Sequence, residues 1–213
     1  MPPKTLGAGN MTTVPLRDLR IALANPKAYV RMRRTTATTV MRPSKFGMFR
    51  NAVFEYHKGK GDALKAQRYL ESKFTIFADK SDLPDYVNKL NTYINRFEAL
   101  GTEVVRIRCR VSIALPGQYA GFRVTGEVPR IDLAKPKGYS LWMFVRDDTG
   151  WSADPRMPLL QDAIARILNA DLGEVGVGVY DFVAGQYFAT RFKSAQVELT
   201  RKTLLGLLAE FAK

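Results

Sequence analysis

The sequence predicts a mixed α/β fold, in which a helical N-terminal part precedes a mixed central sheet flanked by helices. Up to residue 100, apolar side chains recur at three- and four-residue spacing, which is typical of amphipathic helices. From residue 101, short segments alternate apolar and polar side chains, which is typical of half-buried strands. No charged or proline-rich linker interrupts the 213 residues, so we expect a single domain with a loose tail at 1–14, helices at 15–100 and the sheet at 101–213.

Four helices are expected before the sheet. The first is short, because Pro26 follows its apolar positions and proline stops a helix. The last has a long apolar stripe, and Gly101 supplies its C-terminal stop. The predicted ranges are 15–25, 44–56, 62–77 and 82–100.

The sheet is expected to begin with a strand at 103–115. Its apolar side chains, such as Cys109, alternate with arginines, so a row of arginines should occupy the face opposite the core. Because a helix separates the third strand from the fourth, the sheet should combine parallel and antiparallel neighbours. The further predicted strands are 120–132, 139–146, 175–182 and 186–192, and the further helices are 158–169 and 195–212.

The charge is strongly basic and unevenly distributed. The chain has 33 Lys and Arg against 20 Asp and Glu, a net charge of +13, and residues 1–50 hold ten of these bases and one acid. Such a concentration favours a polyanion, with DNA or another nucleic acid as the first choice of partner. A solvated basic face, an acidic protein or an anionic membrane surface are the alternatives, although Thr-rich 31–40 lacks the bulky apolar face of a membrane helix. The candidate phosphate contacts are Arg31, Arg33, Arg34, Arg42, Lys45, Arg106, Arg108 and Arg110.

Several common kinds of site are excluded by composition. One Cys and one His cannot form a zinc cluster or a disulfide framework, and the single Cys favours a reducing compartment, the cytoplasm. We expect His57 to be exposed at a helix end and Cys109 to be a small core residue. There is no phosphate-binding loop, no apolar segment near the roughly 20 residues that span a bilayer, and no apolar stretch at the N-terminus typical of a signal peptide.

Five segments together resemble one nuclease family. They are NPKAY at 25–29, GMFRNAVFE at 47–55, GEVPRID at 126–132, YSLWMFVR at 139–146 and LQDAIA at 160–165. In this order they resemble the RecB-like exonuclease branch of the PD-(D/E)XK nuclease superfamily, whose strands carry G-x-I-D-R-[IVL]-D and [IVLW]-D-[YF]-K before a helix with a glutamine motif. The resemblance implies a restriction-endonuclease-like core that processes DNA.

The resemblance also implies which groups are missing. In the family two acids and a lysine surround one or two divalent ions, but these positions fall on Pro129, Met143 and Val145. Proline and methionine cannot bind a hard cation through their side chains. The expected function is therefore DNA binding by a pseudo-nuclease without a cofactor, and an enzyme is not favoured. Of the family's other positions, the helix histidine falls on Asn51, a preceding acid falls near Arg108, and Gln161 matches.

Two alternatives remain open. A one-residue slip in the alignment would give a divergent Mg²⁺- or Mn²⁺-dependent exonuclease with Asp132 and Asp147 at the metal, although such a slip reverses the face of a strand side chain. Asp132 would otherwise lie at the solvent end of its strand. The other alternative is a structural or inhibitory subunit that docks on a helicase or recombination protein through the apolar residues at 204–208. The catalytic set of the exonuclease alternative is Glu127, Asp132, Arg146, Asp147 and Gln161.

Overall fold

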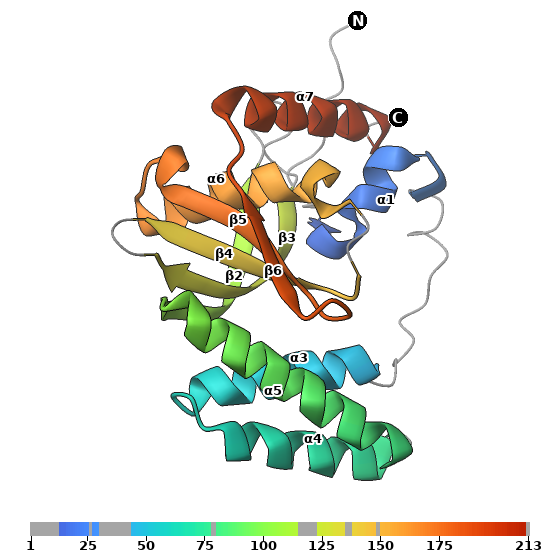
Figure 1. The fold of residues 1–213 in the computed structure, drawn as a ribbon. Helices are drawn as coiled ribbons and strands as arrows, with labels where there is room; N and C mark the ends of the chain where they lie inside the picture. Colours follow the sequence, from blue (N-terminus) through green and yellow to red (C-terminus); the bar gives the residue numbers. More distant parts are fainter. Residues whose placement is uncertain are drawn as a thin grey trace, which may run out of the picture.

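A mixed sheet lies between two layers of helices in the computed structural model (Figure 1), which confirms the mixed α/β class. Within the part of the chain that the structure describes, six strands form this sheet. The described residues are 13–25, 27–29, 44–77, 80–114, 123–134, 138–147 and 150–211.

Strand β3 is the centre of the connectivity. It pairs antiparallel with β2 and β4 and parallel with β1, while β5 runs parallel to β4 and antiparallel to β6. The predicted combination of parallel and antiparallel pairs is therefore confirmed. The strands are β1 (Thr13–Pro15), β2 (Glu103–Ala114), β3 (Arg123–Leu133), β4 (Tyr139–Val145), β5 (Val175–Asp181) and β6 (Gln186–Thr190).

Strand β1 corrects the expectation of a loose tail at 1–14. Thr13 and Val14 belong to a strand whose register pairs Val14 with Val124 of β3. Val14 is buried, so the end of the expected tail contributes to the core. A three-residue strand is too short to show an alternating pattern, which is why the sequence did not indicate it.

The helices begin and end at local signals. Ser44 caps one helix by accepting a hydrogen bond from the Gly47 amide at 3.0 Å, and Gly101 ends another with a left-handed backbone, φ +60°. The predicted helices are confirmed to within a few residues. They are α1 (Leu19–Ala24), α3 (Lys45–Lys58), α4 (Ala63–Phe77), α5 (Leu83–Leu100), α6 (Arg156–Leu168) and α7 (Ser194–Phe211).

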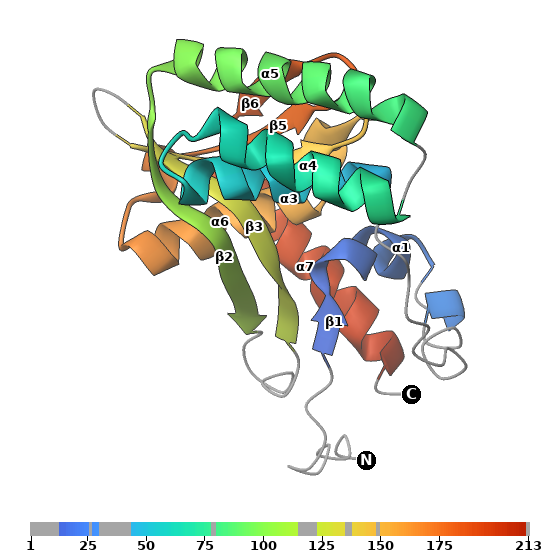
Figure 2. The ribbon, with the colours of Figure 1, turned by 90° about the horizontal axis from the view of Figure 1, so that it is seen from below.

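The two faces of the sheet build two apolar clusters, which we call the α6–α7 core and the α3–α5 core. Figures 1 and 2 show α1, α6 and α7 over one face and α3, α4 and α5 over the other. Strand β5 lies between the layers and is buried along its whole length, as expected for a strand covered on both faces. The α6–α7 core includes Leu160, Val177 and Leu204, and the α3–α5 core includes Phe49, Leu90 and Tyr180.

Two findings bear on the expected partners. Leu204, in the apolar segment considered for docking, is fully buried in the α6–α7 core. Among the described helices, none combines the length and the apolar composition needed to cross a bilayer.

Candidate functional site

Three arginines of β2 form an exposed row, Arg106, Arg108 and Arg110, which we call the arginine row. Cys109, between two of them, is buried and points toward the α6–α7 core, as predicted. The expected alternation fails at Val105, which is 43% exposed because the β2–β3 register shifts by one residue there. It fails again at Arg108, whose backbone is left-handed with φ +53°. Arg106 therefore pairs with Ile131 of the α6–α7 core, and the expectation that all three arginines occupy the face opposite the core is wrong. Strand β2 pairs with β3 alone among the described strands, and in Figure 2 its C-terminal part extends past α3 and α4.

Arg108 is held more firmly than a free surface side chain. Its Nε lies 3.1 Å from Glu127 Oε2, and its guanidinium lies over the Phe54 ring, 5.2 Å from the ring centroid. Its side chain still exposes 59% of its surface. Glu127, a candidate acid of the exonuclease alternative, is thus engaged with an arginine on the neighbouring strand.

Of the five remaining candidate phosphate contacts, the structure describes one. Lys45 is the first residue of α3 and forms an ion pair with Asp82, which precedes α5. The other four candidates, Arg31, Arg33, Arg34 and Arg42, lie outside the described residues. The structure therefore brings together the arginine row but leaves the N-terminal arginines unassigned.

A second arginine environment lies inside the protein. Arg130 and Asp132, two residues apart on β3, share one face of the strand and form an ion pair with 2.9 Å between Arg130 Nε and Asp132 Oδ1. Their side chains are 1% and 0% exposed, and Thr102 Oγ1 donates a hydrogen bond to Asp132 Oδ2 at 3.1 Å. The expectation that Asp132 lies at the solvent end of its strand is wrong, because pairing with β2 and packing against α5 cover it.

Four aromatic rings surround the Arg130 guanidinium. Its Cζ lies 4.7 Å from the ring centroid of Phe97, 5.1 Å from Tyr187, 5.5 Å from Trp142 and 5.6 Å from Tyr93. Its Nη1 donates hydrogen bonds to the hydroxyls of Tyr93 and Tyr187, the latter at 2.8 Å. A buried cation needs such partners, because desolvation is costly without them. Arg130, Asp132 and these rings, hereafter the Arg130 cluster, join α5 to the sheet.

Trp142 can occupy this position because its neighbour on β5 is a glycine. Gly178 is the register partner of Trp142, and a Cβ on Gly178 would lie 2.3 Å from Trp142 Cζ3. The indole therefore lies across the β5 backbone and meets Tyr187 edge to face, with 4.7 Å between ring centroids. The glycine thus gives the cluster one of its four rings.

His57 is part of the same interior and is not the exposed helix end that we expected. Its Nε2 lies 2.6 Å from the Tyr93 hydroxyl, and its ring packs against Phe97 with 4.7 Å between centroids. Burial, and then the charge of Arg130, lower the pKa of His57 from 6.5 to about 3. The imidazole is therefore neutral at pH 7 and can accept a hydrogen bond from the Tyr93 hydroxyl. Packing against α5, far along the chain, is what covers it.

The metal pair of the exonuclease alternative is not assembled. The β3–β4 register places Asp132 opposite Ser140, near the start of β4, whereas Asp147 follows the end of that strand. The five residue-to-residue steps from Ser140 to Val145 span roughly 16 Å at about 3.3 Å per step. Among the described residues, no three His, Cys, Asp or Glu side chains lie close enough to share a metal ion.

Gln161 and Arg146 do not occupy the catalytic positions that the exonuclease alternative assigns to them. Gln161 is fully buried: its Nε2 donates to the carbonyls of Leu172 and Phe192 at 3.0 and 3.1 Å, and its Oε1 accepts from the Phe192 amide at 2.8 Å. It therefore ties α6 to the segments that flank β5 and β6. Arg146 and Asp147 are exposed after β4. Among the described residues, the members of this catalytic set are thus not brought together at one place.

The positions where the nuclease resemblance expects acids and a lysine are apolar. The β3–β4 pairing ends at Arg130 and Trp142, the neighbours of Pro129 and Met143, and Pro129 is buried. Met143 and Val145 are half-buried and pack against the α6–α7 core. These three side chains offer no oxygen or charge to a hard cation.

Comparisons with known proteins add little. No family model matches the chain, and no curated protein matches it. A solved structure titled "Crystal structure of SSO0001" is similar over 87% of this chain and 85% of that chain, at 9% sequence identity and a TM-score of 0.33. A likeness at this TM-score carries no argument about function.

Proposed function

We propose that this protein binds nucleic acid, DNA foremost, through the exposed edge of its sheet, and that it does so without cleaving it. The observation that carries the proposal is the arginine row on β2. The three arginines are exposed within five consecutive residues of one strand, so they line this edge of the sheet with positive charge. Guanidinium groups bind phosphates through two parallel hydrogen bonds, which suits such a line to a nucleic-acid backbone.

The overall charge supports the same partner. A net charge of +13 attracts polyanions over long range and raises their local concentration at the surface. Neutralising several phosphates releases counterions, which makes the affinity strongly dependent on salt. Salt dependence is therefore the most direct signature of the proposed contacts.

We also propose that the chain has a RecB-like nuclease scaffold. Gln161 matches the family's glutamine position, and its hydrogen bonds serve the protein's own packing. Pro129 and Met143, at the positions of the family's acids, are apolar. The proposed activity is therefore binding alone, and we assign no catalytic residue and no cofactor.

Fluorescence anisotropy with labelled single- and double-stranded oligonucleotides tests the proposal. We expect the triple variant Arg106→Gln, Arg108→Gln, Arg110→Gln to bind weakly and to lower the log–log salt slope by about 2 to 3, since each phosphate contact contributes roughly 0.7 to 0.9. The matched control removes three exposed charges from the helical layer with Lys58→Gln, Lys60→Gln and Arg68→Gln.

Two outcomes would contradict the proposal. One is the absence of binding to either oligonucleotide at low salt, and the other is an equal loss in the control variant. The same samples, incubated with Mg²⁺ or Mn²⁺, should leave the oligonucleotides intact. Cleavage activity that co-purifies with the protein would overturn the part of the proposal that denies catalysis.

A further inference from the structure

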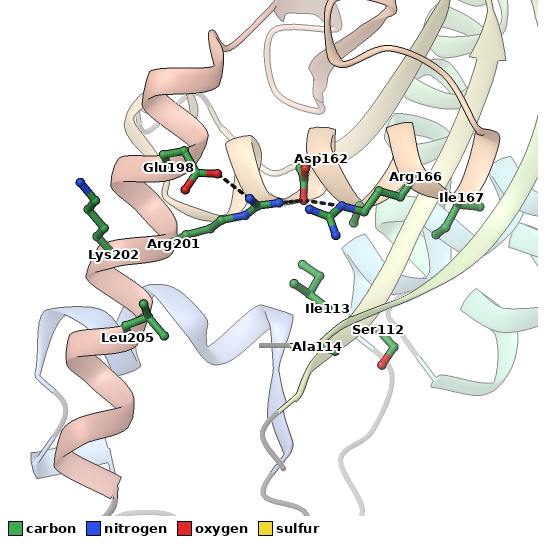
Figure 3. Close-up of a pocket in the computed structure, with 11 residues that line it drawn as sticks. Ser112, Ile113, Ala114, Asp162, Arg166, Ile167, Glu198, Arg201, Lys202 and Leu205 are labelled. Carbon is green, nitrogen blue, oxygen red and sulfur yellow. Dashed lines mark hydrogen bonds and ion pairs between the residues drawn. The ribbon is translucent and has the colours of Figure 1, made fainter. Parts of the chain in front are cut away.

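A pocket of about 730 Å³ opens between the C-terminal part of β2 and helices α6 and α7 (Figure 3). Its size lies within the range of about 300 to 1,000 Å³ that is usual for small-molecule sites. Ile113 from β2, Ile167 from α6 and Leu205 from α7 give it an aliphatic lining. Charged side chains of α6 and α7 complete the wall, so the pocket has both an apolar and an ionic part.

The ionic part is preorganised around one carboxylate. Asp162 accepts a hydrogen bond from Arg201 Nη2 at 2.7 Å and lies 3.2 Å from Arg166 Nε. Glu198 accepts from the other end of Arg201, so that this guanidinium is held across the gap between α7 and α6, as Figure 3 shows. Two guanidiniums thus meet two carboxylates, and Lys202 leaves the lining with one positive charge in excess.

The charge count points to an anionic ligand. Including Lys202, the lining carries three cations against two carboxylates. The Arg166 side chain is 69% exposed, which leaves most of its surface accessible from solvent. A ligand with one phosphate and a body that packs on aliphatic side chains fits this combination.

The pocket is continuous with the arginine row. Ser112, two residues after Arg110 on β2, lines the pocket, and Arg123 Nη1 donates a hydrogen bond to Ser112 Oγ at 3.4 Å. Arg106 pairs with Ile131 and the pocket's Ile113 pairs with Val124, and both partners belong to the α6–α7 core, so Arg106 and the pocket share one side of β2. A nucleic-acid strand that follows β2 from Arg106 toward its C-terminal end therefore reaches the pocket. This continuity favours a nucleotide over other ligands that combine an anion with an apolar body.

We infer that the pocket receives one unpaired nucleotide of the bound strand, with its phosphate at Arg166 and Arg201 and its base and sugar against Ile113, Ile167 and Leu205. The inference rests on the proposed function and names the part of the nucleic acid that the site would hold. A guanidinium plane can also stack on a base, which suits Arg166 at the rim. Because aliphatic side chains form no hydrogen bonds with the edges of a base, the pocket should accept different bases.

Isothermal titration calorimetry of the full chain with deoxyadenosine monophosphate tests the inference. We expect the mononucleotide to bind, and deoxyadenosine or inorganic phosphate to bind at least about tenfold more weakly, because each offers only one of the two kinds of contact. Arg166→Gln should weaken mononucleotide binding by about tenfold, the factor that corresponds to one lost charge-assisted hydrogen bond. Ile167→Glu should weaken it by at least about as much, because it replaces an apolar contact with a negative charge that repels the phosphate. Matched controls outside the pocket, Arg68→Gln and Ile76→Glu on α4, should leave it unchanged.

The outcomes separate this inference from the proposed function. If the triple variant of the arginine row loses oligonucleotide affinity but binds the mononucleotide normally, both stand. If the wild-type chain binds oligonucleotides but not the mononucleotide, or if the controls weaken binding as much as the pocket variants, the pocket inference is overturned and the proposed function survives. If the mononucleotide binds at the pocket and no oligonucleotide binds, the proposed function fails and the idea of a strand-linked nucleotide fails with it.

Discussion

Arg130 and Arg108 lie on neighbouring strands of one sheet, yet their surroundings differ in almost every respect. Arg130 is 1% exposed, paired with a fully buried carboxylate and enclosed by four rings. Arg108 is 59% exposed, paired with half-exposed Glu127 and covered by one ring. The charge of Arg130 is therefore used inside the protein, whereas the arginine row keeps charge that a ligand can reach. A count of basic residues does not distinguish these two uses, but burial does.

The residues to which the nuclease resemblance drew attention show the same contrast. Gln161, at the position of the expected glutamine, and Asp132, a candidate acid of the exonuclease alternative, are both buried and bonded within the protein. Met143 and Val145, where the resemblance expects an acid and a lysine, pack against the α6–α7 core. These four side chains thus serve packing, and none is presented to a ligand.

The largest expected effect comes from breaking the buried pair. Asp132→Ala leaves the Arg130 charge buried without its carboxylate, and we expect it to lower the free energy of unfolding by about 3 to 5 kcal/mol. Glu127→Ala removes the corresponding partner of Arg108 and should cost at most about 1 kcal/mol, because that pair is largely solvated. Urea denaturation followed by circular dichroism measures both.

A double variant sharpens this comparison. Arg130→Met combined with Asp132→Leu removes both charges, so it should be less destabilising than Asp132→Ala alone. Equal losses for Asp132→Ala and Glu127→Ala would contradict the assignment of the two environments.

The second prediction concerns the pH dependence of the buried environment. The pKa of His57 is lowered from 6.5 to about 3 in the folded chain, so below pH 6.5 the unfolded chain binds a proton that the folded chain does not. Stability should therefore fall as the pH falls from 6.5 toward 3, by up to about 1.4 kcal/mol per pH unit. His57→Gln should flatten this fall between pH 6.5 and about pH 5, above the range in which ordinary carboxyl groups titrate. An unchanged slope in urea titrations of the variant would show that His57 is not held neutral.

The sequence predicted local structure well and long-range surroundings poorly. Periodicity located the helices and longer strands, because an amphipathic segment carries its own signal. The burial of Asp132 and His57 depends on α5 and β2, which the pattern around each residue does not contain. The two-residue spacing of Arg130 and Asp132 did contain a usable signal, since such residues share one face of a strand. The pocket joins β2 to two later helices, so no single segment could have indicated it.

The smallest expected effect distinguishes members of the arginine row from one another. Arg106→Gln should reduce the log–log salt slope of oligonucleotide binding by about 0.7 to 0.9, the contribution of one phosphate contact. Arg108→Gln should reduce it less, because Glu127 and the Phe54 ring already hold that guanidinium in the absence of a ligand. The two variants should reverse their order in urea denaturation, where Arg108→Gln costs at most about 1 kcal/mol and Arg106→Gln costs less. Equal salt slopes for the two variants would mean that Arg108 leaves Glu127 when nucleic acid binds. In that case the single variant Glu127→Gln, which keeps Arg108, should bind oligonucleotides more tightly than the wild-type chain.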